Sequence, residues 1–159
     1  VQSRKNRWTT EREIYYCSSW IPSPLHTATS CASYQTVSTL SRRFDLDPSL
    51  VEGHLHALEK FGLIQFNEGR WIFQGASMHF PKNTPLDQAF QLNHRVHAMH
   101  ALAAKKEEEI HYAAVFAADR KTFIRIRELL LKTVENTHKV AEPAPCEEIY
   151  SICLDFFRT

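Results

Sequence analysis

The sequence predicts an α+β protein made of a winged helix-turn-helix, a long linking helix and a strand-helix-strand C-terminal unit. Residues 34 to 75 contain two helical apolar periods, a capped turn and a hairpin pattern in immediate succession. A proline-containing helix start at Thr84 opens another apolar helical pattern. In the last third of the chain, two β-prone segments flank one more helical pattern.

The composition is that of a folded protein without a strong electrostatic bias. The chain has 159 residues, of which 43% are apolar, and its net charge is +1. It is long enough to bury a core, and its charge favours neither nucleic acid nor an anionic membrane. No stretch has the length and apolarity of a transmembrane helix or the layout of a signal peptide. We therefore expect a soluble, cytoplasmic protein without a membrane partner.

We expect four regions: a basic linker over residues 1–9, a winged-helix domain over 10–75, a linker and long helix over 76–110, and the C-terminal unit over 111–159. The first residue is Val1 and not methionine, which a trimmed terminus or a fragment would both explain. Thr10 can cap a first helix, and Pro22 and Pro24 are expected to interrupt it before residues 25–31.

The first half of the winged-helix pattern is a helix, a turn and the start of a second helix. Val37, Leu40 and Phe44 are spaced three and four residues apart, which places them on one side of a helix ending near residue 45. Asp47 can accept hydrogen bonds from the free N–H groups that open the next helix, and Pro48 suits its first position. These signals predict two helices joined by a tight turn.

The second half of the pattern is the second helix and a β-hairpin. The apolar face of the helix is expected to consist of Val51, Leu55 and Leu58. Gly62 stands where a left-handed residue would end that helix. Two β-prone segments, 64–66 and 71–73, then surround a short connection at residues 67–70 that suits a hairpin loop.

A winged helix suggests DNA binding, with the second helix in the major groove and the hairpin on the phosphate backbone. The candidate DNA-contacting residues are Arg42, Arg43, Ser49, Glu52, Gly53, His54, His56, Lys60 and Arg70. Residues 34 to 75 nevertheless carry four basic and five acidic side chains. Because Lys and Arg supply most of the affinity for phosphates, a packing or protein-contact role remains open beside direct DNA contact.

The long helix is expected to run from a cap at Thr84 to about Lys106. Its predicted buried side consists of Phe90, Val96, Met99 and Ala103. His94, His97 and His100 suggest a metal site, but a spacing of three shifts each ring by about 60° around the helix. We therefore expect no metal and no cofactor.

Four cysteines lie far apart in the sequence without a C-x-x-C pair, which gives no local support for a zinc or redox motif. We expect all four to be buried free thiols. They are Cys17, Cys31, Cys146 and Cys153.

The C-terminal unit is predicted as strand, helix, strand. His111 to Ala117 is a short apolar run, and Asp119 can cap a helix from Arg120 to about His138. Residues 148–157 alternate apolar and polar side chains, as in a half-buried strand. Two strands alone are seldom stable in water, so we expect the sheet to gain strands from elsewhere in the chain or from a second copy. Our hypothesis is a homodimer formed through an open sheet edge.

No sequence motif indicates an enzyme. The chain has only 4 glycines and lacks a phosphate-binding glycine loop, a G-x-S-x-G elbow and an H-E-x-x-H pair. We expect a transcription-regulator-like protein whose C-terminal unit dimerises or senses a signal. The alternatives are a protein-protein interaction module and a small-molecule sensor with a pocket between the long helix and the C-terminal sheet.

Several stretches also resemble a known family. They are residues 8–20, the stretch Leu55-x-x-Leu58-Glu59-Lys60-Phe61-Gly62-Leu63-Ile64, the triplet Asn93-His94-Arg95, and the closing residues Phe156 and Thr159. Nearly the full chain resembles a bacterial paralogous family of the Bdellovibrio and Fibrobacter type, composed of predicted transcriptional regulators with a C-terminal domain of unknown function. The resemblance implies that an N-terminal helix-turn-helix part is absent here, and it brings no catalytic residues.

Overall fold

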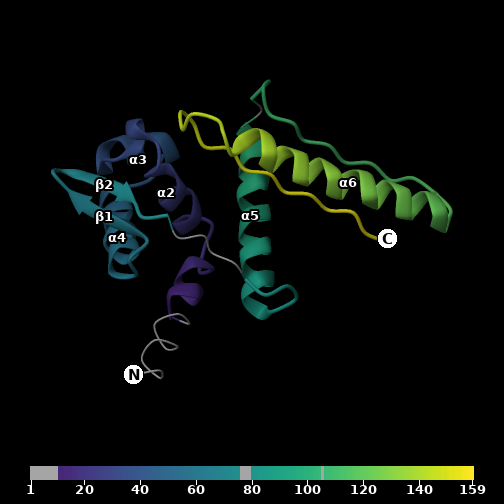
Figure 1. Ribbon diagram of the computed structural model, residues 1–159, viewed down its shortest axis with the longest axis horizontal. Helices are drawn as coiled ribbons and strands as arrows, with labels where there is room; N and C mark the ends of the chain where they lie inside the picture. The colour runs from purple at the N-terminus through teal and green to yellow at the C-terminus, as the bar shows by residue number, and fades with distance from the viewer. Residues whose placement is uncertain (1–10, 76–79, 105) are drawn as a thin grey trace.

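The computed structural model describes residues 11–75, 80–104 and 106–159, and it contains both helices and a small sheet (Figure 1). In chain order the elements are α2 (Pro22–Ala28), the 3-10 helix η1 (Ala32–Tyr34), α3 (Val37–Phe44), α4 (Pro48–Lys60), β1 (Ile64–Asn67), β2 (Arg70–Phe73), α5 (Pro85–Ala104) and α6 (Arg120–Ala141). Residues 11–16 are also helical. The predicted α+β class is confirmed.

The predicted pair of helices is confirmed, with the predicted cap on the second. Thr36 caps α3 by accepting a hydrogen bond from the Thr39 N–H at 3.2 Å. Asp45 ends α3 in the left-handed region, with φ of 52°. Asp47 then accepts hydrogen bonds from the first N–H groups of α4, and Pro48 occupies the first turn of that helix. Local side-chain chemistry therefore sets the bounds of both helices.

The predicted hairpin is also confirmed. Gly62 has φ of 69°, a left-handed conformation that turns the chain out of α4 into β1. β1 and β2 are antiparallel, with Ile64 opposite Phe73. The two residues between the strands, Glu68 and Gly69, have φ of 48° and 81°. Positive φ at both positions is what a tight two-residue hairpin turn requires.

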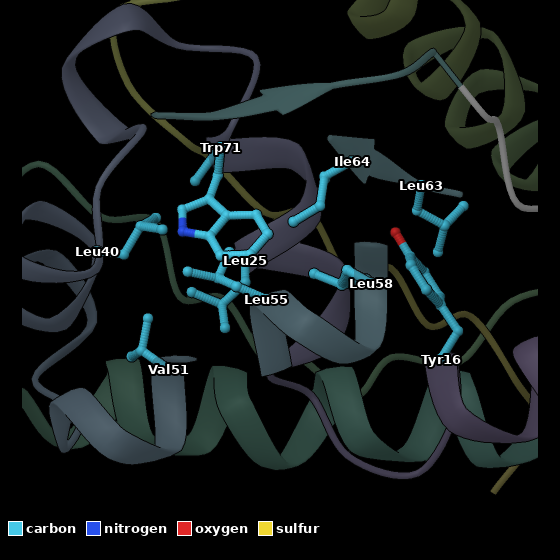
Figure 2. Packing of buried hydrophobic residues seen from close by; sticks show 10 residues of the cluster. Tyr16, Leu25, Leu40, Val51, Leu55, Leu58, Leu63, Ile64 and Trp71 are labelled. Carbon is cyan, nitrogen blue, oxygen red and sulfur yellow. The ribbon is translucent and has the colours of Figure 1, made fainter. Parts of the chain in front are cut away.

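The N-terminal module, residues 11–75, encloses the main hydrophobic core, onto which side chains from its helices and hairpin converge (Figure 2). The buried cluster consists of Tyr16, Leu25, Ala28, Leu40, Val51, Leu55, Leu58, Leu63, Ile64 and Trp71. The predicted apolar face of α4 is confirmed, since its three aliphatic side chains are fully buried. Burial of this cluster holds α4 and the hairpin in fixed relative positions.

A buried polar contact crosses this core. His26 on α2 is 2% exposed, and its Nε2 lies 3.1 Å from the Leu63 carbonyl oxygen. Its Nδ1 lies 3.0 Å from the Tyr16 hydroxyl. The two partners are consistent with one tautomer, in which Nε2–H donates to Leu63 and Nδ1 accepts from Tyr16. Burial lowers the pKa of His26, which favours the neutral form of the ring in the folded protein.

The two prolines near the start of the chain have a different role from the one predicted. Pro22 occupies the first turn of α2 and Pro24 follows two residues later, so both open this helix and do not interrupt an earlier one. The earlier helical turn ends at residue 16, before either proline. The predicted cap at Thr10 and the basic linker over residues 1–9 lie outside the described residues.

α5 begins as predicted, because the Thr84 hydroxyl accepts a hydrogen bond from the Asp87 N–H at 3.2 Å. The prediction of its buried side was wrong for three of four positions. Only Phe90 packs against the core of the N-terminal module. The other three predicted positions are exposed, namely Val96, Met99 and Ala103.

The side of α5 that contacts the N-terminal module is polar and aromatic. The His97 ring stacks on Trp20 with ring centroids 3.9 Å apart. Asn93 Nδ2 donates to the Cys17 carbonyl oxygen at 2.7 Å. Histidine, asparagine and tryptophan side chains thus supply a contact that an apolar periodicity does not reveal.

The predicted C-terminal strands were wrong. Within the described residues the sheet consists of β1 and β2 alone, and residues 111–117 and 148–157 form extended chain in neither helix nor strand. Both segments have strand-like sequences, but a strand also needs a paired backbone. The pocket expected between α5 and a C-terminal sheet is therefore not formed by the described residues. The helix between the segments is confirmed, with Asp119 accepting from the Thr122 N–H at 2.7 Å.

The cysteine prediction was correct for two residues of four. Cys17 and Cys31 are buried free thiols, whereas Cys146 and Cys153 are exposed free thiols. The two exposed thiols lie after α6, in a part of the chain where no side chain is buried.

Candidate functional site

The exposed side of α4 and the adjacent hairpin form a shallow groove of about 500 Å³. It is lined by Val37, Glu52, His56, Glu59, Phe66, Gly69 and Trp71. α4 supplies one wall and the hairpin supplies the other, because the buried faces of both elements are fixed on the shared core (Figure 2). Two of these lining residues, Glu52 and His56, are among the predicted DNA-contacting residues.

The groove combines carboxylates with aromatic rings. Glu59 accepts a hydrogen bond from the Phe66 N–H at 3.1 Å, which fastens α4 to β1. The His56 ring meets the Trp71 ring edge to face, with centroids 5.1 Å apart, and its Nδ1 lies 3.8 Å from Glu59. Glu52 is exposed in the same groove. Two carboxylates make this surface acidic, which opposes phosphate binding inside the groove itself.

Five further predicted contact residues do not line the groove but are exposed. They are Arg42 on α3, Ser49, Gly53 and Lys60 on α4, and Arg70 on β2. A Cβ added to Gly53 would meet nothing within 4 Å, so that part of α4 is open to an approaching partner. Ser49 donates its hydroxyl to Asp47 at the helix cap. On α4, helical spacing places Ser49, Gly53 and Lys60 on the same side as Glu52 and His56.

His54, one of the predicted DNA-contacting residues, is partly buried. Its Nδ1 lies 2.8 Å from the Tyr15 hydroxyl, and the two rings lie 5.9 Å apart. Burial lowers the pKa of His54. The side chain therefore joins α4 to the helical turn at residues 11–16.

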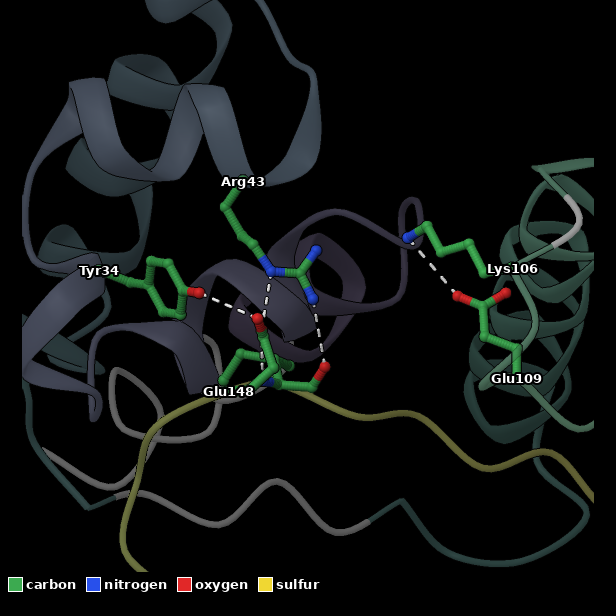
Figure 3. A network of polar contacts seen from close by, with 6 residues as sticks. Tyr34, Arg43, Lys106, Glu109 and Glu148 are labelled. Carbon is green, nitrogen blue, oxygen red and sulfur yellow. Dashed lines mark hydrogen bonds and ion pairs between the residues drawn. The ribbon is translucent and has the colours of Figure 1, made fainter.

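Arg43 on α3 is held by Glu148, which lies near the end of the chain (Figure 3). Its Nε donates to Glu148 at 2.7 Å, and the Tyr34 hydroxyl donates to the same carboxylate at 3.0 Å. Burial alone would raise the pKa of Glu148, but hydrogen bonds from the Ile149 N–H, Arg43 and Tyr34 outweigh it and lower that pKa. This contact fixes residues 148 and 149 on the N-terminal module.

The groove residues that the sequence prediction missed are supplied by the hairpin, by α3 and, in the case of Glu59, by α4. Val37 and Trp71 were predicted only as apolar positions of a helix and a strand, and Phe66 only as part of a β-prone segment. Their place in the groove follows from the packing of the hairpin against α4. Glu59 was predicted only as part of the charge balance. The sequence signal that could have identified Glu59 was an exposed acidic residue one helical turn from His56.

The described residues contain no group of three or more His, Cys, Asp and Glu side chains that could hold a metal ion. His94 and His97 lie partly buried on α5, and burial lowers the pKa of both. In the same described part of the chain, no helix is long and apolar enough to cross a membrane.

Comparison with known proteins gives a family without an assigned function. A family model described as a domain of unknown function, DUF4423, matches residues 2–159. No curated protein and no solved structure shows significant similarity to the chain.

Proposed function

The chain belongs to the DUF4423 family of domains of unknown function, and we propose that it has a non-catalytic, transcription-regulator-like role. The N-terminal module is a winged helix that contacts DNA or supports a DNA reader elsewhere in a longer protein. The C-terminal unit dimerises or senses a signal.

The observation that carries this proposal is the arrangement of α3, α4 and the hairpin around one core. A helix pair joined by a tight turn and followed directly by a two-stranded hairpin is the order of elements in winged helices. α4 buries only one side and leaves Ser49, Gly53 and His56 on the other. A helix exposed in this way next to a hairpin can enter a major groove.

In the proposed complex with DNA, α4 lies in the major groove and the hairpin follows the phosphate backbone. Ser49 and His56 donate hydrogen bonds to base edges or accept them there, and Glu52 can accept a hydrogen bond from the amino group of cytosine. Arg42, Lys60 and Arg70 contact phosphates. Three cations beside two groove carboxylates give weak, salt-sensitive binding for the chain alone.

The test is fluorescence anisotropy of a labelled random duplex, titrated with the chain at several low salt concentrations. We expect affinity to fall with salt, and Lys60→Ala to reduce the salt slope by about one. The matched control is Lys139→Ala, which removes an exposed cation from α6, away from the groove. Absence of binding to random duplex at low ionic strength excludes direct DNA contact. If the salt slope falls equally in both variants, the face assigned to DNA contact is excluded.

The acidic and aromatic lining of the groove favours a second function, a protein-protein interaction module without direct DNA contact. Glu52 and Glu59 beside the Phe66 and Trp71 rings suit a Lys or Arg side chain of a partner protein. A tagged chain that recovers one defined protein from lysate, equally with and without nuclease, supports this function. Loss of that protein in the double variant Glu52→Gln, Glu59→Gln would place the contact in the groove.

A further inference from the structure

Two free thiols from distant parts of the sequence meet where the chain returns to the N-terminal module. Cys31 lies between α2 and η1, and Cys146 lies in the arm that follows α6, residues 142–159. The Cys146 Sγ is 3.5 Å from the hydroxyl oxygen of Ser30, the residue that precedes Cys31. Burial raises the pKa of the Cys31 thiol, and so does its hydrogen bond with the Cys146 thiol. The two sulfurs are therefore neighbours in the folded chain.

Both thiols belong to anchored segments. Cys31 directly precedes η1, and Tyr34 at the end of η1 donates its hydroxyl to Glu148 at 3.0 Å. Glu148 follows Cys146 by two residues and also accepts a hydrogen bond from Arg43 at 2.7 Å (Figure 3). These contacts hold the start of the arm against the residues that carry Cys31, so the two thiols stay close together.

The two thiols differ in their access to solvent. Cys146 is exposed, whereas Cys31 is fully buried. A reagent dissolved in water therefore reaches Cys146 first, and Cys31 can react only with a sulfur that already lies beside it. An accessible cysteine next to a second, resolving cysteine is the arrangement of redox-sensing thiols.

We propose that Cys31 and Cys146 form a reversible disulfide when the protein meets a hydroperoxide, and that this bond locks the arm onto the N-terminal module. In the reduced protein the arm is held by hydrogen bonds and an ion pair, which open and close thermally. The disulfide closes the chain between the two cysteines and opens only on reduction. Oxidation thus converts a dissociable contact into a covalent one.

The reaction has two steps. The Cys146 thiolate attacks one peroxide oxygen, so that an S–O bond forms, the O–O bond breaks and hydroxide leaves to take up a proton. Cys31 then attacks the sulfur of this sulfenic acid and gives up its own proton, so that the S–S bond forms, the S–O bond breaks and water leaves. Two thiols and one hydrogen peroxide become one disulfide and two waters, and the peroxide takes up the two electrons that the sulfurs lose.

The test oxidises the reduced full chain with hydrogen peroxide and maps disulfide-linked peptides by mass spectrometry without reduction. We expect one link within the chain, between the peptides of Cys31 and Cys146, and recovery of both thiols with dithiothreitol. The link should form at least about tenfold faster in the folded chain than in urea, because folding raises the effective concentration of one thiol at the other.

Three variants define the pair. Cys146→Ser should abolish the link, and its exposed position leaves the fold unchanged by circular dichroism. Cys31→Ser should leave Cys146 as a sulfenic acid that dimedone traps. The matched control is Cys153→Ser, which removes the other exposed thiol of the arm and should leave the yield of the link unchanged.

The lock is tested in the variant Glu148→Gln, which weakens the contact with Arg43. Proteinase K should cleave the arm of the reduced variant faster than that of reduced wild type, and oxidation should remove this difference.

The disulfide is refuted if Cys146 links to Cys17 or Cys153 in preference to Cys31, or if Cys146 is overoxidised while Cys31 stays reduced. Equal rates in the folded chain and in urea also refute it. Cleavage of Glu148→Gln that oxidation does not slow refutes the lock.

The inference names an oxidant as the signal for the sensing role of the C-terminal unit, and this link to sensing rests on the proposed function. The disulfide rests only on the contact between the two thiols. A chain that forms the link but binds no duplex excludes DNA contact alone, and a chain that binds duplex without forming the link excludes the disulfide alone.

Discussion

Replacing His26 with phenylalanine tests how the core of the N-terminal module is held together. The variant keeps an aromatic ring for the stack on Phe73, whose centroid lies 4.6 Å from that of His26. It removes the hydrogen bonds to Leu63 and Tyr16. The Leu63 carbonyl keeps a hydrogen bond from the Gln74 N–H at 3.0 Å and is not left unpaired. Losing two ordinary hydrogen bonds lowers the free energy of unfolding by about 1–3 kcal/mol.

This loss should depend on pH, because burial lowers the pKa of His26 in the folded protein. The unfolded chain takes up a proton as the pH falls through about 6.5, and the folded chain takes it up only at a lower pH. The stability that neutral His26 contributes is therefore present above that pH and declines below it. His26→Phe has no such proton to take up, so the difference between the two proteins shrinks in acid.

The assay is urea denaturation followed by circular dichroism at pH 8 and pH 5, at one protein concentration. Other partly buried histidines are common to both proteins and cancel in the difference. The reasoning is refuted if the two proteins have equal stability at pH 8, or if their difference grows as the pH falls.

Three further predictions concern single positions. Gly53→Ala should raise the free energy of unfolding by about 0.5–1 kcal/mol, because the site is helical and open; a lower melting temperature would contradict this. Glu148→Gln should speed proteolysis after α6 by weakening the contact with Arg43; unchanged cleavage would show that the contact does not hold the arm. Cys146 should be alkylated before Cys17, whose pKa burial raises to about 11; the reverse order in peptide mass spectra would refute it.

The elements between residues 34 and 75 could be predicted because their signals are local. Asp47, Pro48 and Gly62 act on backbone groups within a few residues, so the sequence alone places both ends of α4. The apolar spacing of α4 then identifies its buried face. The groove follows from these elements, which is why most of its α4 residues were identified.

The remaining features depend on residues far away in the sequence. His54 faces inward because Tyr15 lies beside it, and Arg43 is occupied because Glu148 returns to it from the end of the chain. The side of α5 that faces the N-terminal module depends on Trp20, which stacks on His97. A pattern within one helix contains no information about such partners.

The failed strand prediction has a similar cause. Alternation in residues 148–157 describes side chains that suit a sheet, but it does not say which backbone completes the sheet.

Amide hydrogen exchange with and without an excess of duplex DNA, at low ionic strength, tests most directly whether the N-terminal module contacts DNA. The predicted result is slower exchange over α4 and the hairpin, centred on residues 49 to 60, with exchange in α5 unchanged. Unchanged exchange over α4, or slower exchange confined to the rest of the chain, would contradict DNA contact by this module.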